Sequence, residues 1–178
     1  MLNLISAAPQ SLDEWLQNPP ERTEWVDGGL LEKDEMTLKH SRVQLKLGAA
    51  WNAYVESSGQ GGIVYTEAPC RTNQQGRSPD VAYLTPELVE QYGNETVLPQ
   101  SFPLIAEIVS PTDRAEELFV KATEYLSSGS QEVWLVLPES QWILILTEQG
   151  RSLFSTGETA ETKILLPGFT VELNKLFG

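Results

Sequence analysis

Two acidic residues lie in apolar surroundings where a carboxylate is unusual. Glu107 interrupts the apolar run 104–109, and Asp80 begins the run 80–84 directly after Pro79. Burial of an unpaired carboxylate is costly, so each residue calls for a cation, a raised pKa or a metal ion. Two carboxylates on adjacent strands would favour Mg²⁺ or Mn²⁺, which orient phosphates and lower the pKa of a bound water. The simpler alternatives are a structural ion pair for Glu107 and a turn role for Asp80.

A lysine on the following helix could complete such a site. Lys121 lies at the edge of the apolar face of a predicted helix, shortly before Tyr125. Its long side chain could carry the ammonium group to the strand ends, where it would stabilise developing charge or position the attacking water. The alternative is an exposed ion pair with Glu117, one helical turn earlier.

His40 and Glu24 are two further candidates. His40 shares the apolar stripe of a predicted helix with Val43 and Leu47, which favours an inward-facing histidine. Glu24 belongs to a run with the alternation of a hairpin strand. We therefore expect at most accessory roles for both.

The elements that must position these residues alternate between strands and helices. The helical period is clear over 38–55, and a second helix is predicted between Ser110 and Gly129. Strand-like runs lie at 63–70, 80–84, 104–109, 132–137 and 142–146. A strand, a crossover helix and a strand predict a parallel pair, and the turn at 148–150 predicts a meander. The pattern is that of an α/β fold, a mixed sheet with helices on its faces.

The remaining sequence indicates one domain with a short amino-terminal lead-in. Ser11 and Glu14 predict a capped helix over 11–16, and Asp27-Gly28 predicts a tight turn between two strands. No repeat, low-complexity tract or long linker divides the sequence. We expect a single domain over 1–178, with a lead-in helix and hairpin over 1–37, a core over 38–147 and a carboxy-terminal meander over 148–178.

Composition excludes several classes of protein. With 40% hydrophobic and 21% charged residues among 178, the chain can form a core and is unlike a disordered protein. Cys70 is the single cysteine, so no intramolecular disulfide can form. No Lys or Arg precedes Pro9, and the apolar runs are far shorter than the roughly 20 residues of a membrane span. These features predict a cytoplasmic protein that does not enter a membrane.

The charge is strongly acidic but unevenly distributed. The 12 Lys and Arg stand against 25 Asp and Glu, for a net charge of −13 and a pI of about 4.4. Such a charge disfavours nonspecific attraction to nucleic acid. The window 39–79 is the exception, because its cations outnumber Glu56 and Glu67. The candidate contacts to nucleic acid are Lys39, Arg42 and Lys46, which share one helical face, and Arg77.

Several short motifs occur together in one order. They are Glu24-Trp25-Val26-Asp27-Gly28, His40, Pro79-Asp80-Val81-Ala82, Glu107-Ile108-Val109-Ser110-Pro111-Thr112-Asp113, Lys121-x-x-x-Tyr125, Gly129, Glu132-Val133-Trp134-Leu135-Val136-x-Pro138 and Leu166-Pro167-Gly168-Phe169. Each motif is weak alone, but the ordered set spans most of the chain. The set resembles the PD-(D/E)XK nuclease superfamily, which has the restriction-endonuclease-like fold, and within it the Uma-two family of restriction endonucleases.

The resemblance implies a phosphodiesterase that depends on Mg²⁺ or Mn²⁺, with Asp80 and Glu107 as metal ligands. The lysine that the superfamily places two residues after the acidic ligand is replaced here by Val109. In this family a lysine on the following helix takes its place, and Lys121 matches that position. Further polar positions near the family's pocket match Glu24 and His40, and Tyr125 belongs to the lysine motif.

Two functions follow from these observations. The leading hypothesis is a metal-dependent endonuclease that hydrolyses phosphodiester bonds in DNA and acts as a homodimer. The alternative is a catalytically silent, dimeric nucleic-acid-binding or regulatory module on the same fold, which Val109 and the acidic composition favour. A glycoside hydrolase ranks below both, because no aromatic platform motif for a sugar is present.

Overall fold

Six strands form the central sheet of the molecule. The computed structural model describes residues 8–33 and 36–178. The strands of this sheet lie in the order β10-β9-β8-β7-β6-β3. In chain order they are β3 (Ile63–Thr66), β6 (Val81–Leu84), β7 (Leu104–Ile108), β8 (Glu132–Leu137), β9 (Trp142–Thr147) and β10 (Gly150–Phe154).

One parallel pair lies in the middle of this sheet. Strands β7 and β8 run parallel and are joined by helix α4 (Ala115–Ser127), whereas the other neighbours in the sheet pair antiparallel. The crossover predicted between the runs 104–109 and 132–137 is therefore confirmed. The protein has an α/β fold with a mixed sheet, as the sequence predicts.

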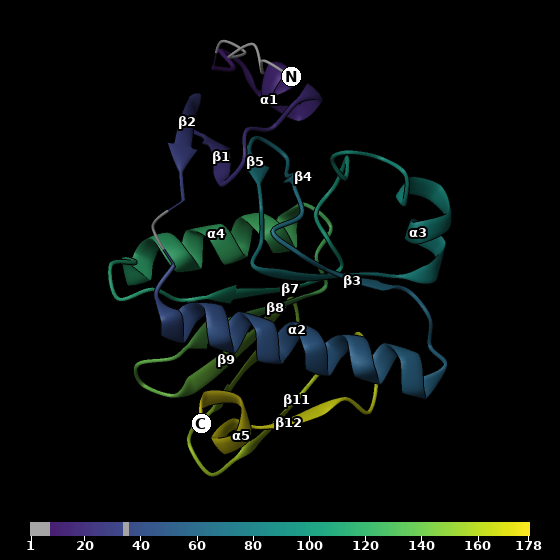
Figure 1. The fold of residues 1–178 in the computed structure, drawn as a ribbon, viewed down its shortest axis with the longest axis vertical. Helices are drawn as coiled ribbons and strands as arrows, with labels where there is room; N and C mark the ends of the chain where they lie inside the picture. Colours follow the sequence, from purple (N-terminus) through teal and green to yellow (C-terminus); the bar gives the residue numbers. More distant parts are fainter. Residues whose placement is uncertain (1–7, 34–35) are drawn as a thin grey trace.

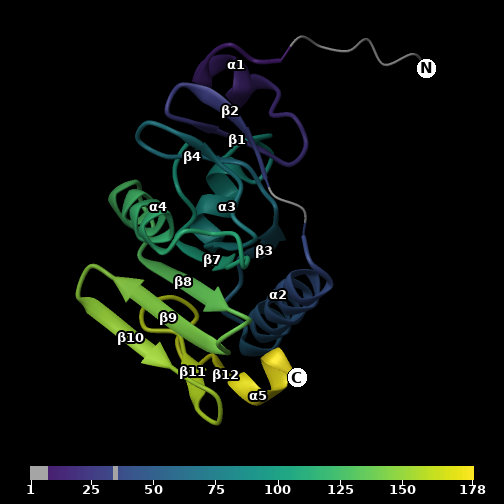
Figure 2. The same cartoon turned by 90° about the vertical axis from the view of Figure 1, so that its left-hand side faces the viewer.

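Helices cover both faces of the central sheet. Helix α2 (Leu38–Ser58) crosses one face, and the short helix α5 (Leu173–Phe177) packs against α2 (Figure 1). Helix α4 lies on the opposite face, so that the sheet separates α4 from α2 (Figure 2). This arrangement confirms the prediction of helices on the faces of the sheet.

Strand β7 shows the two sides of the sheet directly. Leu104, Ala106 and Ile108 belong to the core beneath α2, whereas Ile105 belongs to the core beneath α4. Successive side chains of a strand point to opposite faces. The alternation therefore directs Glu107 to the α4 side.

A second, smaller sheet carries the amino-terminal residues and lies above the central sheet in Figure 1. Its order is β2-β1-β5-β4. Its elements are β1 (Thr23–Val26), β2 (Gly29–Glu32), β4 (Cys70–Arg71) and β5 (Gly76–Arg77), with helix α1 (Leu12–Gln17) beside them.

The predicted helix cap and hairpin turn are both confirmed. The side chain of Ser11 accepts a hydrogen bond from the amide of Glu14 at the start of α1. Asp27 and Gly28 join β1 to β2 with φ angles of 50° and 81°. Left-handed values at both central residues suit the twist of a two-residue hairpin, and glycine adopts them without strain.

The predicted strand over 63–70 is wrong in its extent. It is two strands, β3 and β4, which belong to different sheets. Glu67 has a φ of 53°, in the left-handed region, which ends the extended backbone of β3. A helix that the sequence reading did not include, α3, spans Pro86–Tyr92 after β6.

Of the meander predicted over 148–178, only β10 continues the central sheet, where it pairs with β9. Strands β11 (Thr159–Glu161) and β12 (Thr170–Glu172) form a separate two-stranded sheet, and α5 then returns to α2. The carboxylate of Glu132, at the start of β8, accepts hydrogen bonds from the amides of Lys163 and Ile164. In the described part of the chain, no helix is long and apolar enough to cross a membrane.

Candidate active site

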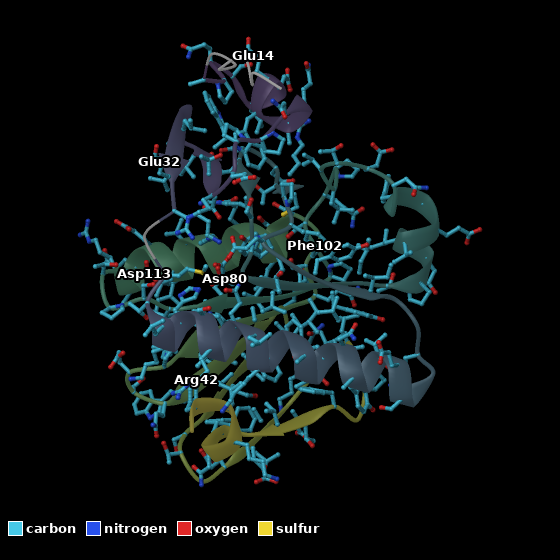
Figure 3. All side chains as sticks on the ribbon, viewed as in Figure 1. Glu14, Glu32, Arg42, Asp80, Phe102 and Asp113 are labelled. Atoms are coloured by element: carbon cyan, nitrogen blue, oxygen red, sulfur yellow. The ribbon has the colours of Figure 1, made fainter. Side chains whose placement is uncertain are left out.

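Asp80 and Glu107 face each other across two central strands. The antiparallel register of β6 and β7 sets Val81 opposite Ala106, so one further step sets Asp80 opposite Glu107. The side chain of Glu107 lies on the α4 side, where it contacts Lys121 and Tyr125. The side chain of Asp80 contacts Lys33, His40 and the amide of Ile108. Only 4% of the Asp80 side chain and 9% of the Glu107 side chain are exposed. The structure thus brings together the two carboxylates that the sequence singled out, and Figure 3 shows Asp80 in the middle of the molecule.

Lys121 reaches this pair from helix α4. Its Nζ lies 3.1 Å from Glu107 Oε1 and 2.9 Å from Glu24 Oε1. The same oxygen of Glu107 accepts a 2.7 Å hydrogen bond from the hydroxyl of Tyr125. Glu117 pairs instead with the residue that precedes α4. The exposed lysine pair considered from the sequence is therefore replaced by a buried one.

Glu24 links the amino-terminal sheet to the site. Its Oε2 accepts a 2.9 Å hydrogen bond from Arg77, and its Oε1 accepts bonds from Lys121 and the amide of Ser78. Arg77 also binds Glu124 of α4 through two nitrogens, at 3.0 and 2.5 Å. Glu24, which the sequence predicts only as an accessory residue, thus joins β1, β5 and α4 in one ion-pair network.

Lys33 is a site residue that sequence reasoning missed. It follows β2, and its Nζ lies 2.9 Å from Asp80 Oδ1 and 2.6 Å from Glu67 Oε2. It also donates to the carbonyl of Ser78, and Gln44 of α2 binds the other oxygen of Glu67 at 3.0 Å. No spacing in the sequence connects these positions. The contact forms only when the hairpin folds over the beginning of β6, next to Asp80.

His40, in the first turn of α2, lies beside Asp80. Its Nε2 is 3.5 Å from Asp80 Oδ2, and its Nδ1 is 3.4 Å from the hydroxyl of Ser110. Asp80 Oδ2 accepts a 2.7 Å bond from the amide of Ile108. Within the described residues, the buried Nε2 of His40 has no hydrogen-bond partner. A buried nitrogen without a partner, next to a carboxylate, is a position where a ligand could bind.

Comparison with known families agrees with this geometry. Residues 9–174 match the family model Uma2, which carries the description "Putative restriction endonuclease". The chain belongs to the Uma2 family. The match includes the central sheet and every candidate site residue described above. The resemblance deduced from the ordered motifs is therefore confirmed.

A solved structure shows the fold of this Uma2 chain. The crystal structure of "a putative nuclease belonging to DUF820" from Anabaena variabilis superposes with a TM-score of 0.83. The alignment covers 95% of this chain and 98% of the other, at 20% sequence identity. No curated protein matches the chain. The restriction-endonuclease-like fold expected from the sequence is therefore confirmed.

The pKa of Glu107 in this Uma2 site is raised mainly by burial. Burial raises the pKa of Glu107 to about 7. The ammonium of Lys121 opposes this rise, whereas the carboxylates of Asp80 and Glu24 add to it. Of the buried carboxylates at the site, Glu107 is the one that the surrounding cations compensate least.

The other two buried carboxylates have lowered pKa values. Burial would raise the pKa of Asp80, but His40 and Lys33 outweigh it and hold the pKa well below its usual range. Burial acts in the same direction on Glu24, where the cations Lys121 and Arg77 lower the pKa to about 2. Both residues therefore carry their negative charge at neutral pH.

The charges of the site fit a divalent cation. Five carboxylates stand against three cations: Glu24, Glu67, Asp80, Glu107 and Glu124 against Lys33, Arg77 and Lys121. In residues 8–33 and 36–178, no group of three or more His, Cys, Asp or Glu could hold a metal ion. Mg²⁺, however, binds through one or two carboxylates and keeps several waters. Asp80 and Glu107, with Nε2 of His40 3.5 Å from Asp80, therefore suit Mg²⁺ or Mn²⁺.

A cavity of about 630 Å³ opens above these residues. Asp80, Glu107 and Lys121 line it, and the hairpin and the beginning of α4 supply other lining residues. The side chains of Asp80 and Glu107 are almost fully buried, so they form its floor. The cavity is of a size that accommodates a small organic ligand.

The four residues proposed to contact nucleic acid lie in different places. Arg77 lines the cavity, but its guanidinium is engaged with carboxylates of the network. Lys39 pairs with Glu139 at 3.0 Å. Arg42 and Lys46 bind backbone carbonyls of residues 175–178, at the end of the chain. A role for these residues in nucleic-acid binding stays a prediction.

Proposed function

We propose that this Uma2 protein is a Mg²⁺- or Mn²⁺-dependent endonuclease that hydrolyses phosphodiester bonds in DNA. The observation that carries the proposal is the opposed, buried pair of Asp80 and Glu107, with the ammonium of Lys121 3.1 Å from Glu107. A pair of carboxylates that can hold a hard cation, next to a fixed positive charge, suits metal-assisted attack of water on a phosphodiester. The family match supports the same reaction class.

Lys121 acts as a fixed positive charge rather than as a base. Burial lowers the pKa of Lys121, but the carboxylates of Glu107 and Glu24 outweigh burial and raise it. The ammonium group therefore keeps its proton at neutral pH. It can donate hydrogen bonds and stabilise negative charge on a phosphate, but it cannot accept the proton of the attacking water.

Asp80 and Glu107 are the residues that would hold the metal ion. A bound ion supplies Lewis-acid activation of the phosphate and a water of lowered pKa. Tyr125 and Lys121 both bind Oε1 of Glu107, and the amide of Ile108 binds Oδ2 of Asp80. These contacts fix both carboxylates before a ligand enters, which reduces the reorganisation needed for catalysis.

Cleavage of labelled DNA in Mg²⁺ and in Mn²⁺ tests the proposal. The wild type is expected to cut DNA, and Asp80→Asn and Glu107→Gln are expected to stop the cutting and weaken metal binding in a calorimetric titration. Glu90→Gln is the matched control, because it removes one exposed carboxylate on α3, outside the cavity. The proposal fails if the wild type binds neither ion and cuts neither DNA nor RNA.

A catalytically silent, dimeric nucleic-acid-binding or regulatory module on the same fold is the second candidate. It is favoured by Lys33, whose ammonium lies 2.9 Å from Asp80, in contact with one of the proposed metal ligands. Val109 in place of the superfamily lysine favours it too. Metal binding by the wild type without cleavage of single-stranded DNA, double-stranded DNA or RNA would support this candidate.

We further propose that the protein forms a homodimer. Trp142 and Leu153, on the neighbouring strands β9 and β10, are 45% and 53% exposed. Apolar side chains of this size on a sheet edge suit a protein interface. Light scattering should give twice the chain mass of 19.8 kDa. A mass equal to one chain at micromolar concentration would contradict the dimer.

A further inference from the structure

Most cations of this acidic protein are already engaged. Three lie in the site network, four pair with surface carboxylates and two bind backbone carbonyls: Lys33, Arg77 and Lys121; Lys39, Arg114, Lys163 and Lys175; Arg42 and Lys46. Binding to duplex DNA depends on Lys and Arg that neutralise several phosphates. Neutralisation of duplex phosphates by these nine residues would require these contacts to break.

Carboxylates dominate the rim of the cavity. Asp27 and Glu32 belong to the hairpin, Asp113 lies in the loop before α4, and Glu116 and Glu117 lie in the first turn of α4; all five are exposed. Figure 3 shows Glu32 on the hairpin and Asp113 in the loop that leads into α4. Charges within about 8 Å of a phosphate act on it even at physiological salt. A rigid duplex lying over the rim would bring many phosphates near these carboxylates.

Exposed apolar side chains share the same rim. Leu31 is 50% exposed, Met36 40% and Val120 66%, and all three line the cavity. Leu31 comes from the hairpin and Val120 from α4, so the apolar surface spans the two elements that carry the carboxylates. Such side chains can pack against the face of an unstacked nucleobase, but the bases of a duplex are not available to them.

We propose that the substrate of this site is an unpaired strand. The inference rests on the proposed nuclease function. One nucleotide of a single strand enters the cavity, its base packs against Leu31, Met36 and Val120, and its phosphate reaches the floor at Asp80 and Glu107. The volume of about 630 Å³ is suited to one such unit. Duplex DNA is disfavoured by the charge of the rim and by the burial of Asp80 and Glu107, whose side chains are only 4% and 9% exposed.

Three DNA substrates of one sequence test the inference: a single strand, a blunt duplex and a duplex with a single-stranded tail. In Mn²⁺ the single strand and the tail are expected to be cut at least about tenfold faster than the duplex. Fluorescence anisotropy in EDTA measures binding without cleavage and is expected to favour the single strand. Equal or faster cutting of the blunt duplex, or equal binding of the two forms, would overturn the inference.

Hydrolysis of bis(4-nitrophenyl) phosphate separates the inference from the function on which it rests. This small diester needs the floor of the cavity but carries no strand. If it is hydrolysed by the wild type and not by Glu107→Gln, while duplex and single strand are cut equally, then the inference alone is wrong. If neither the diester nor any DNA is hydrolysed in Mg²⁺ or Mn²⁺, the proposed function is wrong.

Two sets of rim variants sharpen the test. Glu116→Lys is expected to raise duplex binding several-fold, whereas Glu90→Lys, an equal change in charge on α3, should raise it less. Leu31→Ser with Val120→Ser is expected to weaken single-strand binding several-fold, because the apolar contact with the base is lost. An equal effect of Glu90→Lys, or unchanged single-strand binding in the serine variant, would contradict the proposed roles of the rim.

Discussion

The parallel strands β7 and β8 each bury a glutamate, and the two carboxylates have very different surroundings. Glu132 of β8 is fully buried, and its Oε1 accepts a 2.7 Å bond from the indole nitrogen of Trp134. Its Oε2 accepts bonds of 2.9 and 2.8 Å from the amides of Lys163 and Ile164. Glu107 of β7, in contrast, lies opposite another carboxylate and contacts a charged ammonium group.

The difference separates a structural carboxylate from one suited to bind a ligand. Neutral donors converge on Glu132 and hold residues 163 and 164 against the start of β8. Around Glu107 the negative charges of Asp80 and Glu24 remain in excess, so the free energy of the folded protein falls when a proton or a cation binds there. Two glutamates on adjacent strands thus differ in their surroundings: neutral donors satisfy Glu132, whereas Glu107 is the residue that we propose binds a ligand.

The largest expected effect is the loss of activity in Glu107→Gln. Removal of the charge should lower turnover of a phosphodiester by at least about 1000-fold.

The same variant predicts a pH-dependent change in stability. The folded-state pKa of Glu107, about 7, lies above the usual 4.5, so its favourable contribution to the free energy of unfolding is full below pH 4.5 and is lost as pH rises through 7. At pH 8 the variant should therefore be as stable as the wild type or more stable. A kinetic assay measures the turnover, and urea unfolding at pH 8 measures the stability. A large loss of stability in Glu107→Gln would mean that Glu107, like Glu132, is a structural carboxylate.

Glu132→Ala should have the opposite profile. It leaves the amides of residues 163 and 164 and the indole of Trp134 without their acceptor, at an expected cost of about 4 kcal/mol. Catalysis per folded molecule should persist, because Glu132 lies outside the cavity lining. Denaturant unfolding and an activity assay at low temperature measure the two effects. An inactive but fully stable variant would reverse the assignment.

Glu24 predicts the response of the site network to acid. Its folded-state pKa of about 2 lies below the usual 4.5, so its contribution to stability is present above pH 4.5 and lost as pH falls toward 2. The wild type should lose on the order of 3 kcal/mol through this group, and Glu24→Gln should show a correspondingly shallower dependence. Unfolding midpoints between pH 5 and pH 2 test this, with Glu90→Gln as the exposed control. Parallel curves for wild type and Glu24→Gln would contradict the prediction.

The smallest effect expected is that of Trp134→Phe. The substitution keeps an aromatic ring near Trp51 but removes the indole donor to Glu132. A loss of about 2 kcal/mol follows, because one buried carboxylate oxygen loses its donor and the smaller ring leaves space in the core, while the amides of residues 163 and 164 still satisfy the other oxygen. Thermal unfolding measures it. A loss as large as that of Glu132→Ala would mean that the indole dominates the stability of this carboxylate.

Much of the fold could be predicted because local patterns determine local structure. The cap at Ser11, the turn at Asp27 and the crossover between β7 and β8 each depend on residues close in sequence. The end of β3 could not be predicted, since it requires Glu67 to adopt a left-handed backbone that glutamate rarely occupies. The separate two-stranded sheet formed within residues 159–178 could not be predicted either, because the position of this segment depends on contacts with β8.

The candidate site was predictable only in part. Asp80, Glu107 and Lys121 stand out because each polar group interrupts or borders an apolar pattern. Glu24 was predicted only as an accessory residue, and Lys33 was missed, because both act through contacts with residues more than thirty positions away. An ion pair between distant residues leaves no trace in the periodicity of either segment.

By itself the sequence determined the α/β class, the family and the two carboxylates of the floor, because apolar periodicity and ordered motifs are properties of the chain alone. The tertiary structure decided which cation each carboxylate meets, that the lead-in hairpin supplies Glu24 and Lys33, and that carboxylates and apolar side chains share the rim of the cavity. The physical reason is that charge compensation and burial depend on distances in space, and these are set only when the hairpin, β6, β7 and α4 pack together.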